Sequence, residues 1–234
     1  KEDNSPVLTP VLNYKINLPA GVDPMQILPK LRAIEEEEPQ LHIEWDENFK
    51  EIHVQVMGPV MIEVLQNIIK ERFGIDVTFG EGSIVYKETI ANKVEGIGHF
   101  EPLRHYAEVV LEIAPAERNS GITFDSTVHI DVLSANYQAL VKTHIFEKQH
   151  KGILTGSPLT DVKITLINGR AHLKHTEGGD FRQATYRAIR QGLEKAENVI
   201  LEPFYAFEIY AGEEYAGRIM TDIQRLRGSF EPPV

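Results

Sequence analysis

The order of apolar and polar positions in the first 80 residues predicts four strands and two helices. Apolar side chains alternate with polar ones in the strand-like stretches, as they do from Leu12 to Ile16, and recur at every third or fourth position in the helical ones. The strands are expected at 7–18, 41–45, 51–57 and 75–79, and the helices at 24–38 and 60–73. The resulting β-α-β-β-α-β order is typical of a ferredoxin-like fold.

The ends of these two helices carry recognisable signals. Asp23 is a good N-cap for the first helix, and Gln26 three positions on completes a capping box. Gly74 is a natural C-cap for the second helix. The face of the second helix that is expected to be buried consists of Val64, Leu65, Ile68 and Ile69.

A second unit is expected after a short linker, Gly80-Glu81-Gly82-Ser83. Two glycines here suggest a phosphate-binding loop, but neither Gly-Lys-Ser/Thr nor a helix follows, so a linker is the better interpretation. The unit is predicted to hold extended segments at 84–90 and 91–96, an irregular bend at 98–102, strands at 106–113, 122–130 and 159–167, and helices at 134–148 and 180–196.

A long polar loop from Asn168 to Arg182 separates the last of these strands from the last helix. It contains two histidines, basic residues and a Gly-Gly pair. Asp180 is expected to N-cap the helix, with Gln183 completing a capping box. Long polar loops held by rigid elements are where function concentrates, so this loop is the leading candidate site.

The remaining residues predict a strand at 205–210 and a helix at 213–226, with Gly228 as its C-cap. One strand and one helix cannot bury a sufficient core alone, so this stretch is interpreted as the truncated start of a domain. The predicted domains are therefore 1–82, 83–201 and 202–234.

Charge is distributed unevenly along the chain. The net charge of −11 argues against a nucleic-acid binder as a whole, but residues 141–195 hold ten Lys/Arg against five Asp/Glu, together with four of the nine histidines. An acidic protein with one basic lobe fits a polyanion contact confined to that lobe, and chance unevenness on a solvated surface is the alternative.

Composition also bounds the setting of the protein. No apolar run approaches the roughly 20 residues of a membrane helix, and the polar, acidic start does not resemble a signal peptide. Cysteine is absent, which excludes disulfides, thiolate metal sites and a cysteine nucleophile. A cytoplasmic location is the simplest expectation.

The polar loop offers chemistry for RNA better than chemistry for catalysis. Arg170 and Lys174 can contact phosphates, while His172 and His175 can stack on bases or hydrogen-bond to them. Arg182 is expected to be exposed on the helix that follows. The spacing of the two histidines is one that metals use, but no carboxylate pattern accompanies them, so no metal site is predicted; ordinary exposed histidines are the other alternative. Catalytic motifs are absent.

Several motifs, in order, resemble the C-terminal half of a translational GTPase of the elongation factor G type. Val85-Tyr86-Lys87-Glu88-Thr89-Ile90 resembles the entry to domain IV, and Leu201-Glu202-Pro203 resembles the start of domain V. Met57–Val64 resembles a stretch of domain III. Asp180-Phe181-Arg182 and Phe207–Ala211 resemble the tetracycline-resistance ribosomal protection proteins, which are the branch that looks closest.

The resemblance implies an α+β fold and a ribosomal partner. Domain III would be ferredoxin-like, domain IV a ribosomal protein S5 domain 2-like domain with a left-handed β-α-β crossover, and the end of the chain a truncated ferredoxin-like unit. The domain IV tip would contact small-subunit rRNA near the decoding centre and promote drug release in the parent protein. The residues expected to bind rRNA are Arg170, His172, Lys174, His175 and Arg182.

Within the resemblance, His172 occupies the position of the tip-loop histidine of elongation factor G. The loop of the protection proteins is rich in tyrosine, serine and proline, whereas this chain has Ala171-His172-Leu173-Lys174-His175. An elongation factor G-like translocation or ribosome-remodelling factor is therefore the alternative, and a GTP-independent RNA-binding module is a further one.

The resemblance also implies that the parent binds and hydrolyses GTP with magnesium. The phosphate-binding sequence Gly-x-x-x-x-Gly-Lys-Ser/Thr does not occur in this chain. These residues are therefore expected to need no cofactor, to turn over no nucleotide and to be monomeric. A hydrolase with a histidine-based metal site is the enzymatic alternative.

Overall fold

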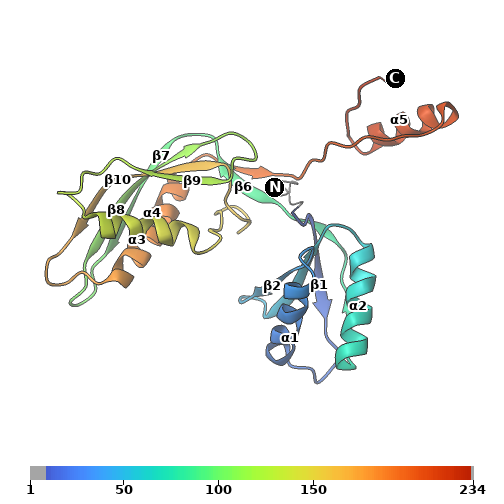
Figure 1. The fold of residues 1–234 in the computed structure, drawn as a ribbon, viewed down its shortest axis with the longest axis horizontal. Coiled ribbons are helices and arrows are strands. Elements are labelled where there is room, and N and C mark those ends of the chain that lie inside the picture. The colour runs from blue at the N-terminus through green and yellow to red at the C-terminus, as the bar shows by residue number, and fades with distance from the viewer. Residues whose placement is uncertain (1–8, 233–234) are drawn as a thin grey trace, which may run out of the picture. The chain divides into compact units, whose positions relative to one another are not determined.

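The computed structural model describes residues 9–232 and divides the chain into two compact units, with the division between Pro203 and Phe204. The first unit contains two separate hydrophobic cores. The second is a small helical unit. Each is described by itself below (Figure 1).

The N-terminal part has the ferredoxin-like arrangement that the sequence predicts. Its elements are β1 (Leu12–Asn17), α1 (Pro24–Glu37), β2 (His42–Asp46), β3 (Glu51–Val56), α2 (Val60–Phe73) and β4 (Thr78–Phe79). The strands form an antiparallel sheet in the order β2-β3-β1-β4, and β5 (Ser83–Ile84) also pairs with β1. The core lies between this sheet and the two helices.

Helix ends in this part follow local chemistry. The Asp23 side chain accepts the Met25 N–H at 2.9 Å and so caps α1, and Gly74 ends α2 in the left-handed conformation at φ 67°. The prediction that Val64 is buried is wrong, because Val64 is 41% exposed while Leu65 and Ile69 face the core. The fourth strand is limited to two residues.

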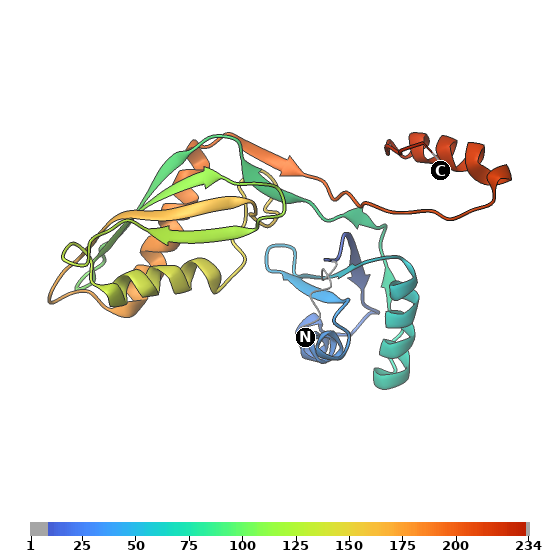
Figure 2. The same cartoon turned by 45° about the horizontal axis from the view of Figure 1, so that its top comes forward.

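The second part is built on a four-stranded sheet. Its strands are β7 (Val94–Phe100), β8 (Ala107–Pro115), β9 (Ile122–Ser126) and β10 (Val162–Ala171), in the order β7-β8-β10-β9. β10 is antiparallel to β8 and parallel to β9, so β9-α3-β10 is a parallel β-α-β unit. β6 (Lys87–Ile90) pairs separately with β11 (Asn198–Leu201), as Figure 2 shows.

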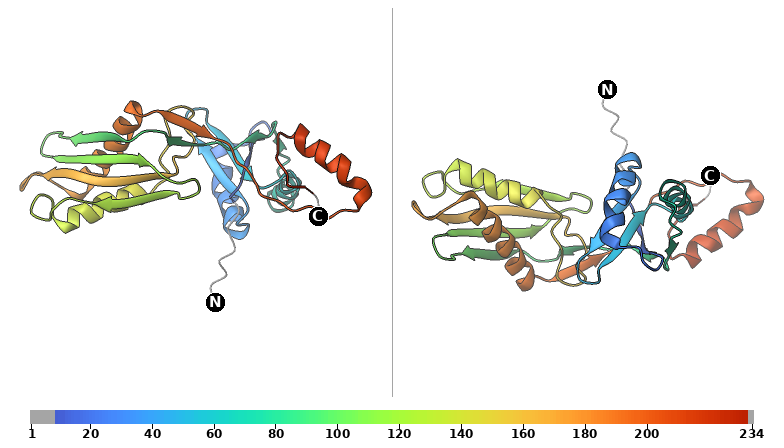
Figure 3. Two further views of the ribbon diagram at one scale, coloured as in Figure 1. Left: turned by 90° about the horizontal axis from the view of Figure 1, so that it is seen from above. Right: turned by 90° about the horizontal axis from the view of Figure 1, so that it is seen from below.

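Helices α3 (Ala135–Phe146) and α4 (Gly178–Lys195) cover one face of this sheet, as both views in Figure 3 show. Two glycines of β7 allow α4 to approach closely. A Cβ on Gly96 would lie 1.9 Å from the carbonyl oxygen of Ala188, and one on Gly98 would lie 1.7 Å from that of Ala184. Only glycine fits at these two positions, because the obstacle is helix backbone.

A buried carboxylate holds the loop before β10. Glu88 is fully buried. Its carboxylate accepts hydrogen bonds from the backbone N–H groups of Leu154, Thr155 and Ser157 at 2.7, 3.2 and 3.0 Å. The Thr155 hydroxyl donates a further bond at 3.0 Å. These donors replace the hydration that the carboxylate loses on burial.

Several predicted element bounds in this part are wrong. The irregular bend expected at 98–102 is mostly strand, because β7 continues to Phe100 and pairs with β8 to its end. β9 ends at Ser126, four residues before the predicted end at Ile130. β10 begins at Val162 and continues to Ala171, where the loop was expected to have begun.

The second unit contains η1 (Glu213–Tyr215) and α5 (Ala216–Arg225). The strand expected at 205–210 is not formed, since no strand among residues 9–232 pairs with it. Gly228 is not the C-cap either. Arg227 takes the left-handed conformation at φ 58°, and the Gly228 N–H donates to the Ile223 carbonyl at 2.9 Å. The interpretation of this unit as a truncated domain stays a prediction.

Candidate functional site

Two loops meet at one end of the four-stranded sheet and form a tip. One is the β7–β8 turn, residues 101–106, and the other is the β10–α4 loop, residues 172–177; they lie together at the lower left of Figure 1. The Tyr106 N–H donates to the His175 carbonyl at 3.0 Å. The Thr176 hydroxyl donates to the Tyr106 carbonyl at 2.6 Å. The two loops are therefore one connected structure, which we call the tip.

The first predicted site residue, Arg170, lies in strand β10 and not in a loop. It is paired in register with Glu108 of β8. Its guanidinium carbon lies 5.9 Å from the centre of the Tyr106 ring, within the range of a cation–π contact. Strand pairing therefore holds Arg170 at the base of the tip.

The two histidines of the β10–α4 loop stack on each other. Their ring centres are 4.6 Å apart and their planes differ by 25°. Both His172 and His175 are exposed, as are Leu173 and Lys174 between them. The Lys174 N–H donates to His172 Nδ1 at 3.2 Å, which orients that ring. The tip thus presents paired imidazoles beside a lysine and an arginine.

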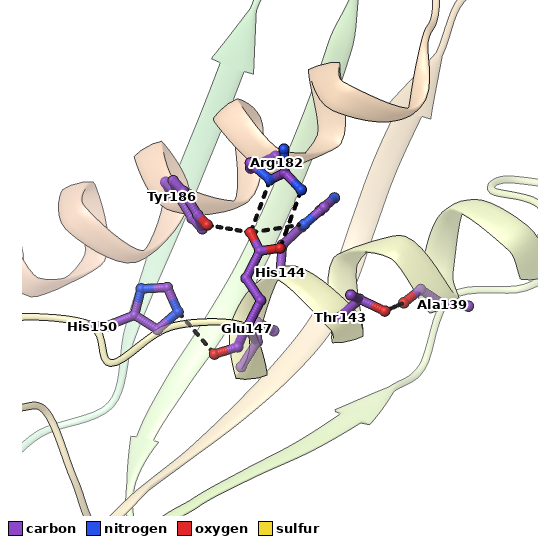
Figure 4. Close-up of polar contacts among 8 residues, drawn as sticks. Ala139, Thr143, His144, Glu147, His150, Arg182 and Tyr186 are labelled. Atoms are coloured by element: carbon purple, nitrogen blue, oxygen red, sulfur yellow. Dashed lines mark hydrogen bonds and ion pairs between the residues drawn. The ribbon is translucent and has the colours of Figure 1, made fainter. Parts of the chain in front are cut away.

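The last predicted site residue, Arg182, is not part of this group. It is exposed on α4, as expected, but its guanidinium binds the carboxylate of Glu147, just after α3. The Tyr186 hydroxyl donates to the same carboxylate (Figure 4). These bonds, from Tyr186 first and from Arg182 second, lower the pKa of Glu147 to about 2. Burial and the Glu147 hydrogen bond raise the pKa of Tyr186 to about 12.

The start of α4 corrects the expected role of Asp180. The N-cap is Glu177, so the helix begins at Gly178 and Asp180 is its third residue, not its cap. Asp180 Oδ2 accepts the Glu177 N–H at 2.9 Å, and Oδ1 lies 2.9 Å from Nδ1 of His105. The expected capping box with Gln183 is therefore replaced by one between Glu177 and Asp180. Asp180 also ties the β7–β8 turn to the helix.

Sequence reasoning missed the contribution of the β7–β8 turn. Leu103 is 91% exposed, and Arg104 is exposed in the left-handed conformation at φ 66°. With His105 and Tyr106 they line a shallow depression that His172 and His175 complete. The available signal was the short stretch with Pro102, Leu103 and Arg104 between two alternating segments of the sequence.

His99, near the end of β7, adds charge to this side of the tip. Its Nε2 lies 2.8 Å from Glu101, and its ring makes an edge contact with Tyr106 at 5.4 Å. Its pKa is raised chiefly by the hydrogen bond to Glu101 and further by Glu108. The tip therefore combines cationic and imidazole groups with some acidic neighbours.

No group of three or more potential metal-ligand side chains occurs among residues 9–232. The stacked imidazoles of the tip supply only two potential ligand side chains. Within the same range, no helix is both long and apolar enough to cross a membrane.

Comparisons with known proteins identify both parts of the larger unit. Residues 7–81 match the family Elongation Factor G, domain III, and residues 82–197 match the family Elongation factor G, domain IV. A crystal structure of a protein from Thermus thermophilus resembles the chain with a TM-score of 0.68 and 26% sequence identity. That likeness covers 95% of this chain and 34% of the other, so the chain spans about a third of that protein's length.

Proposed function

We propose that the chain, which belongs to the elongation factor G family through its domains III and IV, binds the ribosome. The part that makes the contact is the domain IV tip. The ligand is RNA of the small ribosomal subunit near the decoding centre. The observation that carries this proposal is the exposed tip itself, where stacked imidazoles stand beside Arg170 and Lys174.

The chemistry of the tip suits a nucleic acid. Arginine and lysine bind phosphate oxygens, and flat imidazole rings stack on unpaired bases, which is how single-stranded RNA is commonly held. Leu173, which follows His172 in the loop, is fully exposed, so its apolar side chain can pack against a base. A tip held by strand pairing on one side and a helix start on the other is ordered before it meets a ligand.

The test is the binding of the 234-residue chain to purified small ribosomal subunits, measured by co-sedimentation at increasing salt. Phosphate contacts release counterions, so the affinity should fall steeply as salt rises. A tip variant, in which Arg170, His172, Lys174 and His175 are changed together to alanine, should bind much more weakly. Wild-type binding by that variant would refute the proposal.

The finer proposal is that the parent protein is a ribosomal protection factor that releases tetracycline. It is supported by the motifs Asp180-Phe181-Arg182 and Phe207–Ala211. Expression of the full-length gene in a drug-sensitive host should then raise the tetracycline concentration needed to stop growth. No change in drug sensitivity would contradict it.

The second candidate is a factor that acts in translocation or ribosome remodelling. The position of His172 at the exposed end of the tip favours it, because the family resemblance puts the tip histidine of elongation factor G there. Rescue of translocation in a factor-depleted translation system by the full-length protein, without protection against tetracycline, would support this candidate over the first.

GTP hydrolysis is not proposed for these residues. The sequence lacks the Gly-x-x-x-x-Gly-Lys-Ser/Thr loop that cradles nucleotide phosphates. We therefore propose no GTP–magnesium site in these residues. We further propose that the chain acts as a monomer in the cytoplasm, where ribosomes are found.

A further inference from the structure

The side chain of Thr176 connects the two loops of the tip through one oxygen atom. Its hydroxyl accepts the His172 N–H at 2.6 Å and donates to the Tyr106 carbonyl at 2.6 Å. On the other side, the Tyr106 N–H donates to the His175 carbonyl at 3.0 Å. His172, through the Thr176 hydroxyl, and His175, through its carbonyl, are therefore both connected to Tyr106.

The same contacts close the β10–α4 loop on itself. The N–H groups of His175 and Thr176 both donate to the His172 carbonyl, at 3.2 and 3.1 Å. This tight turn brings the centres of the two imidazole rings to 4.6 Å from each other. Because the Thr176 hydroxyl holds the His172 N–H, the side chain fixes the backbone from which the first ring projects.

Thr176 differs from the residues before it in burial. His172 to His175 are all exposed, whereas Thr176 is half-buried and its hydroxyl is turned to backbone groups of the protein. The exposed rings are free to meet a ligand. The threonine instead determines where those rings stand.

We infer that Thr176 is a positioning residue for the RNA contact of the tip, which sets the His172–His175 stack before RNA binds. This inference rests on the proposed function. A side chain already held in its bound geometry loses less conformational freedom on binding, so affinity depends on the residue that holds it. Valine at this position keeps the shape of threonine but removes the hydroxyl.

The first test is spectroscopic and needs no ribosome. In carbon-resolved proton NMR spectra of the 234-residue chain, Thr176→Val should move the imidazole signals of His172 and His175 toward unstacked values. Thr176→Ser, which keeps the hydroxyl, should leave them in place. The signals of the buried His144 and His150 should not change in either variant and so report an intact fold.

The second test is affinity for small ribosomal subunits. Thr176→Val should weaken binding about three- to tenfold, the range expected for the loss of one or two hydrogen bonds, and Thr176→Ser should restore it. Thr143→Val is a matched control, because it removes a hydroxyl that donates to the Ala139 carbonyl on α3 at 3.0 Å (Figure 4). Its binding should equal that of the wild type.

The outcomes separate this inference from the proposed function. If the imidazole signals stay in place in Thr176→Val, Thr176 does not set the stack. If they move but only the four-residue tip variant loses binding, the stack is not what RNA needs, and the inference fails while the proposed function stands. If the tip variant binds like the wild type, the proposed function fails, and the inference fails with it.

Discussion

The guanidinium of Arg182 makes a two-point contact with the carboxylate of Glu147, with Nε 3.0 Å from Oε1 and Nη2 3.3 Å from Oε2. The contact joins α4 to the end of α3, and Tyr186 donates to the same carboxylate. An arginine committed in this way is poorly placed to take a phosphate as well. The pair places Arg182 at the contact between α3 and α4, and its expected role in binding rRNA stays a prediction.

Changing Arg182 to alanine removes one positive charge, which weakens binding to any polyanion slightly. Apart from that effect, the affinity for small ribosomal subunits should stay within about twofold of the wild type. The substitution should lower the midpoint of thermal unfolding modestly, because the pair is partly solvent-exposed. Co-sedimentation and circular dichroism measure the two effects. A loss of binding as large as that of the tip variant would show that Arg182 takes part in the RNA contact.

The same pair predicts a pH dependence of stability. The pKa of Glu147 falls from 4.5 to about 2 in the folded chain, so folding favours the ionised carboxylate. Its stabilising contribution is complete above pH 4.5 and is lost as the pH falls toward 2. Glu147→Gln should therefore be less stable than the wild type at about pH 6, and the difference should shrink toward about pH 2.

Denaturant unfolding at several pH values measures this difference between Glu147→Gln and the wild type. Glu194→Gln, on the exposed side of α4, controls for the loss of a carboxylate elsewhere on the same pair of helices. A stability gap that stays constant over this pH range would show that the Glu147 contacts do not depend on its charge.

Gly98 should tolerate no larger residue. An added Cβ would meet the Ala184 carbonyl of α4 at 1.7 Å, and backbone cannot move aside cheaply. Gly98→Ala should cost about 3 kcal/mol in the free energy of unfolding. Gly179→Ala, with nothing within 4 Å in the first turn of the same helix, is the control and should change stability by at most about 1 kcal/mol. Equal stabilities would mean that α4 does not sit so close to β7.

Glu88 should be needed for the loop before β10. Glu88→Gln replaces an accepting oxygen with an NH2 group, which would face backbone N–H donors of residues 154–157. One buried donor left unpaired should cost about 2–3 kcal/mol. Amide hydrogen exchange of Leu154 and Ser157 should also accelerate. Glu95→Gln, on an exposed strand position, should change neither quantity.

The ferredoxin-like part was predictable because its signals are local. Alternating strands, Asp23 before Pro24 and Gly74 after α2 each act through their own neighbours, and all agree with the sheet that forms. The strand predicted at 205–210, where five of the six residues are apolar or aromatic, did not form. A strand needs a partner, and the residues of one segment alone do not supply it.

The tip could be predicted only in part from the sequence. The two histidines and Lys174 could be identified because they lie in a long polar loop between two predicted elements, and such loops often carry function. Arg170 was placed in the loop because the strand was expected to end at residue 167, whereas pairing with β8 continues the strand to Ala171. The role of Thr176 and the β7–β8 turn depend on a contact across 70 residues of chain, which no local pattern encodes.

The central claim, that the tip contacts RNA, is tested most directly by the salt dependence of small-subunit binding. The tip variant is compared with the wild type and with a control, Lys93→Ala/Lys163→Ala, which removes two exposed lysines of the same domain. Loss of the Arg170 and Lys174 phosphate contacts should reduce the slope of log affinity against log salt by roughly 1.4–1.8, while the control keeps the wild-type slope. Equal slopes and affinities for all three proteins would contradict the claim.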